Sequence, residues 1–408
     1  MIQVMSGHMR HNEMSIYENN KALKVLCLPA WYPSEDNPVE GVFVKEQAKA
    51  VNLYDDVIVL YITQSKTAKK LYTVSDSVEE GIRTIRVKYA HSPLPYTNYL
   101  LSFLVPIFIT ILVSRRLIKE GFRPDVIHAH VFTAGVPAVI MGRLHKIPVI
   151  ITEHYSNFID HTLSKLEVII AKYVMTRANL VLPVSNCLKK HIEAYGIHAS
   201  FSIIPNVVNT ELFTNREPGE ININPKKLLT VALLRDGKGI NYLLQSVKRL
   251  SLKCNDLTLD IIGDGPGRAE LEALSIKEGI ADIVRFHGLK DKKEVSKFMR
   301  ETDIFVLPSL AESFGCVFIE AMASGVPIIA TNVGAMPEIV TEDIGTLVSP
   351  MNADELADAI DYMLDHYLKY DPRSIRRYAV EKYGYETVGL QIDKLYRQSI
   401  LNYKTGKR

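Results

Sequence analysis

The chain has 408 residues, long enough for two domains that each bury a core. A hydrophobic fraction of 47%, a charged fraction of 23% and a mean hydropathy of +0.04 exclude a disordered chain and one built mainly of membrane spans. The net charge is +2, and we expect no nucleic-acid partner. Residues 1–205 carry 22 Lys and Arg against 17 Asp and Glu. This excess of positive charge fits either an anionic partner or charges scattered by chance.

Residues 1–21 are polar and contain no apolar core, so they are not a secretory signal, and we expect a disordered leader or a misassigned start. The four cysteines lie far apart and form no C-x-x-C pair. They are Cys27, Cys187, Cys254 and Cys316. This spacing predicts a reduced, cytoplasmic protein without structural zinc.

Strand and helix patterns alternate from about residue 23 to about residue 365. Most of the strand patterns are short, β-branched and apolar on both faces, as in a parallel sheet covered on both sides. We expect strands at 24–28, 57–62, 84–87, 126–128, 149–152, 180–184, 228–233, 257–263, 284–287, 304–308 and 328–330. We expect helices at 44–53, 162–176, 240–250, 268–277 and 293–301, and a helical segment at 374–403 interrupted at Gly384.

A polar break near residues 204–209 separates two sets of βα units. The predicted fold class is therefore α/β, with two doubly wound, Rossmann-like domains and a cleft between them. We place the N-terminal domain at 22–207, the C-terminal domain at 208–385, and a C-terminal helix that crosses back to the N-terminal domain at 386–408.

The most apolar stretch, residues 100–113, is shorter than the roughly 20 residues that a membrane span needs, and it holds Pro106. A buried helix is the preferred interpretation. The alternative is a helix in the bilayer interface that places Arg115, Arg116 and Lys119 on lipid headgroups.

Three loops of the first half follow predicted strands. The first contains Gly41, whose missing side chain lets backbone approach a phosphate. His128 and His130 end another strand, and we take them to point to opposite faces of it. With no H-E-x-x-H run, we predict no metal site. The third loop, which we expect on the acceptor side, holds Glu153, His154 and Tyr155.

The most informative run is 309–327. Glu312 lies in a loop after a strand, and Glu320 lies about two turns into a helix that we expect from Phe314 to Gly325. The unpaired N–H groups at the start of this helix suit an anion. A phosphate between two carboxylates fits a nucleotide sugar, with its diphosphate in the middle and polyols at both ends.

Lys238 follows strand 228–233 and can neutralise a diphosphate as a point charge without a metal ion. The run from Gly263 to Gly267 is not a dinucleotide fingerprint, because Arg268 occupies the sixth position of G-x-G-x-x-G.

The run 309–327 resembles the E-x7-E signature of the retaining family 4 glycosyltransferases of the GT-B fold. Runs 261–266, 285–289 and 331–339 are also similar to that family, so the resemblance covers about 23–370. It implies that Glu320 holds the donor ribose, that Glu312 lies near the transferred sugar and leaving phosphate, and that His130 lies beside the sugar. The other donor-binding residues that it implies are Gly263, Gly265, Gly288, Leu289, Phe314, Gly315, Cys316 and Val317.

The chain departs from the family pattern at two places. Leu233 stands where the family usually carries an arginine, five positions before Lys238, and we expect Arg235 to reach the same phosphate instead. The loop at Gly41 has one glycine where the family usually has two.

Residues 31–48 are similar to enzymes of bacterial cell-surface polymers such as teichuronic acid, capsule and lipopolysaccharide. The resemblance implies a retaining transferase, without metal or cofactor, that acts on a saccharide or lipid-linked oligosaccharide at the inner face of the cytoplasmic membrane. Two alternatives stay open: a nucleotide-sugar 2-epimerase on the same fold, and a non-catalytic sugar-nucleotide-binding partner.

Overall fold

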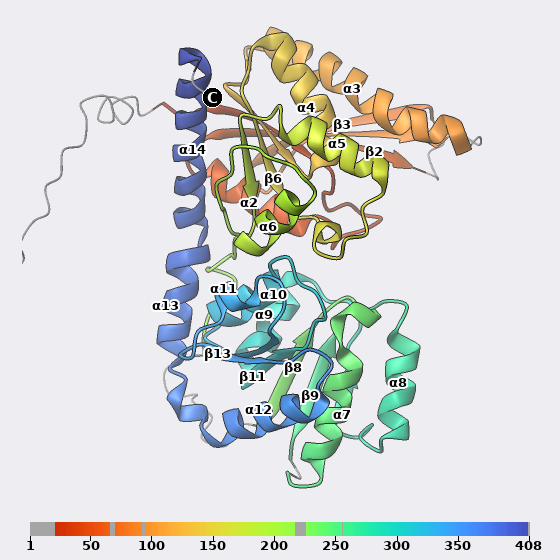
Figure 1. Cartoon of the computed structure of the whole chain (residues 1–408), viewed down its shortest axis with the longest axis vertical. Coiled ribbons are helices and arrows are strands. Elements are labelled where there is room, and N and C mark those ends of the chain that lie inside the picture. The colour runs from red at the N-terminus through yellow and green to blue at the C-terminus, as the bar shows by residue number, and fades with distance from the viewer. Residues whose placement is uncertain (1–20, 66–69, 92–94, 217–225, 255, 407–408) are drawn as a thin grey trace, which may run out of the picture.

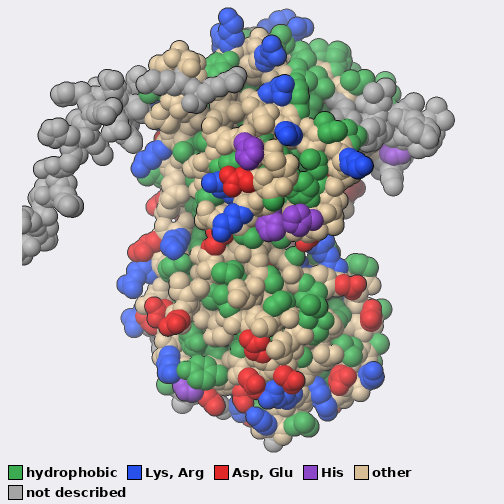
Figure 2. Space-filling view, in the orientation of Figure 1, with side chains coloured by type: hydrophobic (Ala, Val, Ile, Leu, Met, Phe, Trp, Pro, Cys, Tyr) green, Lys and Arg blue, Asp and Glu red, His purple; other side chains and the backbone are tan. Residues whose placement is uncertain are grey.

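The computed structural model describes residues 21–65, 70–91, 95–216, 226–254 and 256–406 (Figure 1). The leader predicted at 1–21 lies outside these ranges except for its last residue. The chain forms two lobes, each with a sheet covered by helices on both faces (Figure 1). The molecule narrows between the lobes in the space-filling view (Figure 2).

The first sheet has the strand order β3-β4-β2-β1-β5-β6-β7. Its strands are parallel except for β3, which pairs with β4 in the antiparallel sense. The bounds are β1 Lys24–Pro29, β2 Asp56–Ser65, β3 Tyr72–Glu79, β4 Ile82–Ala90, β5 Val126–His130, β6 Val149–Glu153 and β7 Leu180–Pro183. The central strands are buried along nearly their whole length, as their apolar sequences predict.

The second sheet is entirely parallel, in the order β10-β9-β8-β11-β12-β13. Its strands are β8 Lys227–Val231, β9 Thr258–Ile262, β10 Val284–Phe286, β11 Ile304–Leu307, β12 Ile328–Thr331 and β13 Gly345–Val348. Parallel strands bring their carboxyl ends to one edge, so the loops that follow β8, β9, β11 and β12 lie together. The predicted α/β class with two doubly wound domains is confirmed, whereas the domain boundaries stay a prediction.

Helices of the first lobe are α2 Val42–Asn52, α3 Pro95–Lys119, α4 Phe132–His145, α5 Lys165–Met175 and α6 Asn186–Ala194. Those of the second are α7 Ile240–Ser251, α8 Arg268–Lys277, α9 Lys292–Glu301, α10 Cys316–Ala323, α11 Met336–Ile339, α12 Ala353–Asp365 and α13 Pro372–Tyr383. Helix α14, Tyr385–Thr405, runs back along the N-terminal lobe and packs on α2 (Figure 1).

The structure corrects the expectation for the apolar stretch 100–113. It belongs to α3, which is 25 residues long, and the described part of this helix from residue 104 onward has both buried and exposed side chains. Leu104, Phe108 and Leu112 recur every four residues, so they form one exposed stripe, and their exposed fractions are 53%, 62% and 47%. Within the described ranges, no helix combines the length and the apolar character that a bilayer span requires.

A buried hydrogen-bonded chain joins α14 to the first sheet. Tyr396 is fully buried, and its hydroxyl lies 2.6 Å from Nδ1 of His128. The other ring nitrogen of His128, Nε2, lies 2.7 Å from Oγ1 of Thr152 on the next strand. The C-terminal helix is therefore tied by a polar contact to the strand that ends at His130.

We expect Tyr396→Phe to lower the stability of the N-terminal lobe by about 1–3 kcal/mol, because it leaves a buried ring nitrogen unpaired. Thermal unfolding followed by circular dichroism measures the effect. Tyr403→Phe is the matched control, since Tyr403 lies on the same helix and is 38% exposed. Equal melting temperatures for the two variants would contradict this role of Tyr396.

Candidate active site

An ion pair joins the two loops that carry the predicted donor residues. Nζ of Lys238 lies 2.7 Å from Oε2 of Glu312. Lys238 follows β8 and Glu312 follows β11, and these two strands are neighbours in the second sheet. Both side chains are largely shielded from solvent, with exposed fractions of 17% and 11%. The structure thus brings together two residues that are 74 positions apart in the sequence.

The loops around this pair approach each other too closely for side chains at two glycines. Gly334 has a φ of +56°, and a Cβ there would lie 1.8 Å from the carbonyl oxygen of Glu312. The N–H of Ala335 donates to that oxygen at 3.1 Å. Gly263 has a φ of +133°, and a Cβ there would lie 1.8 Å from the carbonyl oxygen of Ala232. Both glycines let backbone fill the space beside the ion pair.

The helix after Glu312 begins later than predicted. Helix α10 starts at Cys316, with Gly315 as its N-cap at φ 81°, and it ends at Ala323. Phe314 is therefore outside the helix, and it is buried against Tyr383 at a ring distance of 5.7 Å. Burial raises the pKa of the Cys316 thiol to about 12, so this side chain is neutral at the helix start.

Glu320 is only 5% exposed, and only one of its two carboxylate oxygens has a partner among the described residues. Its Oε1 forms an ion pair with Nζ of Lys292, the first residue of α9. Its Oε2 is buried and has no hydrogen-bond partner among the described residues. Sequence reasoning missed Lys292, and no local signal could have found it, because α9 and α10 are separate elements that meet only in the folded domain.

The remaining donor residues predicted in the second lobe lie at the same edge of its sheet, whereas Gly41 is the N-cap of α2 in the first lobe. Gly265 lies against the backbone of Leu234, and Gly288 accepts a hydrogen bond from the N–H of Gly263 at 2.9 Å. Arg235 and Leu289 are exposed. Leu233 is 49% exposed, so the missing family arginine leaves an apolar side chain in contact with solvent.

In the first lobe, three histidines form a buried cluster, which corrects the expectation for His128 and His130. Residues two apart on a strand point to the same face, and the rings of these two lie 4.3 Å apart. Nδ1 of His130 lies 3.2 Å from Nε2 of His154. Burial lowers the pKa of His130 well below its usual value and that of His154 to about 3, so both rings are neutral at pH 7.

Glu153, predicted to lie on the acceptor side, supports its own loop from inside the lobe. It is fully buried, and its oxygens accept the N–H groups of Phe132, His154 and Tyr155 at 3.0, 2.9 and 2.9 Å. Burial raises its pKa to about 7, against the effect of these three hydrogen bonds. Tyr155 is partly exposed and packs edge-on against Trp31. Trp31 lies ten residues before Gly41, and Gly41 is the N-cap of α2.

Four hydrogen bonds connect the two lobes beside the site. The carboxylate of Glu338 accepts the N–H groups of Asn186 and Cys187 at 2.9 and 2.7 Å, and the Asn186 side-chain amide at 3.0 Å. These donors begin α6, so a carboxylate from one lobe caps a helix of the other. The hydroxyl of Ser185 donates to the carbonyl oxygen of Ser313 at 2.9 Å, next to Glu312.

Within the described ranges, no three or more His, Cys, Asp and Glu side chains are grouped so that they could hold a metal ion. The positive charge beside Glu312 comes from Lys238.

Two family profiles together match residues 56–382 of the chain. The profile described as "Glycosyltransferase Family 4" matches residues 56–212, and the profile described as "Glycosyl transferases group 1" matches residues 211–382. The fold and these matches define a glycosyltransferase of the GT-B type. The chain belongs to the family 4 glycosyltransferases.

Curated relatives from bacteria and archaea agree with this assignment. The chain is 27% identical over 376 residues to glycogen synthase of Mycobacterium tuberculosis, covering 86% of this chain and 88% of the relative. It is 27% identical over 399 residues to TuaC of Bacillus subtilis, a glycosyltransferase named for teichuronic acid biosynthesis, covering 91% and 95%. It is 30% identical over 251 residues to an uncharacterized glycosyltransferase of Methanocaldococcus jannaschii, covering 61% and 67%.

Solved structures show the same fold. Sucrose-phosphate synthase from Thermosynechococcus elongatus superposes with a TM-score of 0.74 at 21% identity, covering 92% of this chain and 98% of that one. Anabaena HepE in complex with UDP gives 0.71 at 19% identity, covering 92% and 100%. The predicted GT-B fold is confirmed, and these matches favour neither the 2-epimerase nor the non-catalytic alternative.

We expect Glu338→Ala to loosen the contact between the lobes, because the N-terminus of α6 loses three hydrogen bonds to a carboxylate. Small-angle X-ray scattering should show a larger radius of gyration than for the unaltered protein. Glu342→Ala, an exposed glutamate four residues on, is the control and should not change it. An unchanged radius for Glu338→Ala would show that the lobes are held by other contacts.

Proposed function

We propose that this glycosyltransferase moves a sugar from a nucleoside-diphosphate sugar to a hydroxyl of a lipid-linked saccharide, with retention at the anomeric carbon, in cell-surface polysaccharide synthesis. The observation that carries the proposal is the contact between Lys238 and Glu312 at 2.7 Å. It places a cation and a carboxylate at the carboxyl ends of the strands of the second sheet. The first N–H groups of α10 lie four residues beyond Glu312.

In this proposal the cations and the helix start bind the diphosphate. Lys238 neutralises the charge that develops on the leaving oxygen, and the start of α10 adds backbone donors. Arg235 is exposed on the same loop as Lys238 and is free to reach a phosphate, which supports its assignment as a replacement for the arginine absent at Leu233. This charge arrangement needs no metal ion and no other cofactor.

Glu320 is proposed to hold the ribose. Its buried Oε2 has no hydrogen-bond partner among the described residues, and a hydroxyl donor would satisfy it. The neutral ring of His130 is suited to a hydrogen bond with a sugar hydroxyl rather than to proton transfer as a cation.

The proposed transfer takes place on one face of the donor sugar. The acceptor oxygen forms its bond to the anomeric carbon as the bond to the leaving phosphate breaks, and the acceptor proton passes to that phosphate oxygen. Glu312 then positions Lys238 and the sugar and forms no covalent bond. The protein contributes positioning and electrostatic stabilisation.

The lipid-linked acceptor is supported by α3 and by one relative. The exposed stripe Leu104, Phe108 and Leu112 is followed by the exposed cations Arg115 and Lys119, a pattern that fits the interface of an anionic bilayer. TuaC, which matches 91% of the chain, is named for the synthesis of a cell-wall polymer. We therefore place the reaction at the cytoplasmic face of the membrane.

A thermal-shift panel of UDP, GDP, ADP and their common sugars tests the donor assignment. Ligand at a hundred times its Kd stabilises the folded state by about 2.7 kcal/mol, which gives a measurable rise in melting temperature. We expect one nucleoside diphosphate and its sugar to raise it, and Glu320→Ala to reduce the shift. A panel without any shift would contradict the proposed donor.

We expect Lys238→Ala to lower the rate of UDP, GDP or ADP release from the donor that the panel identifies by about 10²–10³-fold, as for removal of one group that stabilises a developing negative charge. Arg235→Ala should lower it by about tenfold. Lys277→Ala, which removes an exposed cation at the end of α8, is the control. Full turnover by Arg235→Ala would show that Arg235 does not replace the family arginine.

A further inference from the structure

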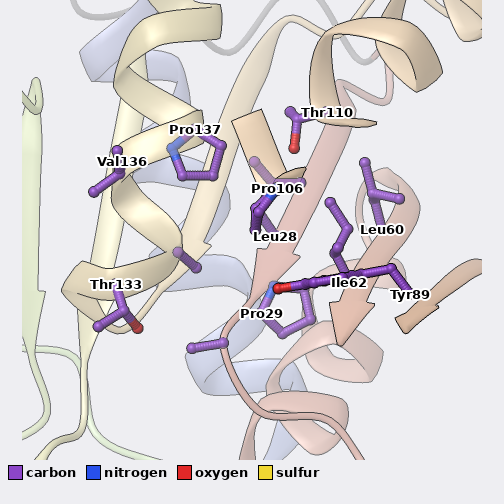
Figure 3. Close-up of a pocket in the computed structure, with 12 residues that line it drawn as sticks. Leu28, Pro29, Leu60, Ile62, Tyr89, Pro106, Thr110, Thr133, Val136 and Pro137 are labelled. Atoms are coloured by element: carbon purple, nitrogen blue, oxygen red, sulfur yellow. The ribbon is translucent and has the colours of Figure 1, made fainter. Parts of the chain in front are cut away.

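A pocket walled mostly by apolar residues lies in the N-terminal lobe between α3, α4 and the ends of β1 and β2 (Figure 3). Its volume is about 160 Å³. Nine of its wall residues are aliphatic or proline: Leu28, Pro29, Ala30, Leu60, Ile62, Pro106, Ala134, Val136 and Pro137. A cavity of about this size accommodates a benzene-sized apolar molecule.

One wall residue brings an unused polar group into this apolar setting. Thr110, on α3, is fully buried, and its hydroxyl has no hydrogen-bond partner among the described residues. Figure 3 shows the Thr110 side chain above Pro106 and Leu28, directed toward the interior of the pocket. Because a buried hydroxyl without a partner is costly, the site suits a ligand that is mostly apolar and has one group able to hydrogen-bond.

The pocket adjoins the acceptor side of the candidate site. Ala30 lines it, and the N–H of Ala30 donates to the carbonyl oxygen of His130 at 3.1 Å. The next residue, Trp31, packs against Tyr155 at a ring distance of 5.3 Å. The pocket wall is therefore in backbone contact with the strand end that carries His130.

The pocket also adjoins the surface stripe of α3. Pro106 and Thr110 face the pocket, whereas Leu104, Phe108 and Leu112 of the same helix face solvent. A chain that leaves the pocket past α3 thus meets an apolar surface that ends in the cations Arg115 and Lys119.

We infer that this pocket binds the first segment of the acceptor's lipid chain, next to its phosphate-bearing head. The inference rests on the proposed function, since it names the part of a lipid-linked acceptor that this lobe recognises. The volume admits about one five-carbon unit. The rest of the chain lies along α3 toward the bilayer, so the pocket fixes the distance between the membrane and the reacting hydroxyl.

Trp31 allows a direct binding test, because it is the only tryptophan of the chain and lies beside the pocket. Farnesyl phosphate and dodecyl phosphate, each kept below the concentration at which it aggregates, are titrated against the full-length protein while Trp31 emission is followed. We expect a saturable change. A preference for farnesyl phosphate would assign an isoprenoid chain, and a preference for dodecyl phosphate an acyl chain.

Three variants locate the binding. Ala134→Phe fills the pocket and should weaken binding at least tenfold, and Thr110→Val should weaken it about fivefold by removing one hydrogen bond. Thr230→Val is the matched control, because Thr230 is also fully buried with an unpartnered hydroxyl but belongs to the other lobe. It should bind as the unaltered protein does.

No saturable change with either phosphate, or equal affinity of Ala134→Phe and the unaltered protein, would overturn the inference. The nucleotide thermal shift is measured on the same samples. If the unaltered protein shows the nucleotide shift but no lipid binding, only the pocket assignment is contradicted. If it shows neither the nucleotide shift nor lipid binding, the proposed donor function is contradicted as well. Retained melting temperatures show that the variants fold.

Discussion

The ion pair between Lys238 and Glu312 is the contact on which the candidate site depends. It joins the loops after two neighbouring strands, and Gly334 and Ala335 of a third loop press on the backbone of Glu312. The carboxylate of Glu312 holds the Lys238 ammonium in a fixed position between these loops. The same loop contacts the other lobe through Ser313, so the proposed donor site and a contact between the lobes share one short segment.

The two lobes contribute different chemistry to the cleft. The second lobe supplies the cations Lys238 and Arg235 and the backbone donors at the start of α10, where we propose that the diphosphate binds. The first lobe supplies buried groups: burial keeps His130 and His154 uncharged, and the Glu153 carboxylate accepts backbone N–H groups. In the proposed reaction, negative charge collects on the leaving group, which would lie beside the cations of the second lobe.

Much of the fold could be predicted from local patterns. Helix α8 occupies the predicted residues 268–277, and most central strands lie within two or three residues of their predicted ends, because apolar β-branched runs and helical periodicity are local properties. Strand β3 was missed because its side chains are almost all exposed, and it depends on β4 for its hydrogen bonds. The start of α10 was placed too early, since Gly315 adopts a left-handed conformation there. Lys292 and Glu338 could not be found, because each contacts its partner only after separate elements have packed.

The central claim is that this site transfers a sugar with retention, and the anomeric configuration of the product tests it most directly. With the donor identified by its nucleotide, the first glycoside formed on a lipid-linked acceptor is analysed by proton NMR before any later conversion. A product with the same anomeric configuration as the donor sugar is the predicted result. A product with the opposite configuration would contradict the account, because same-face attack assisted by the leaving phosphate cannot invert that carbon.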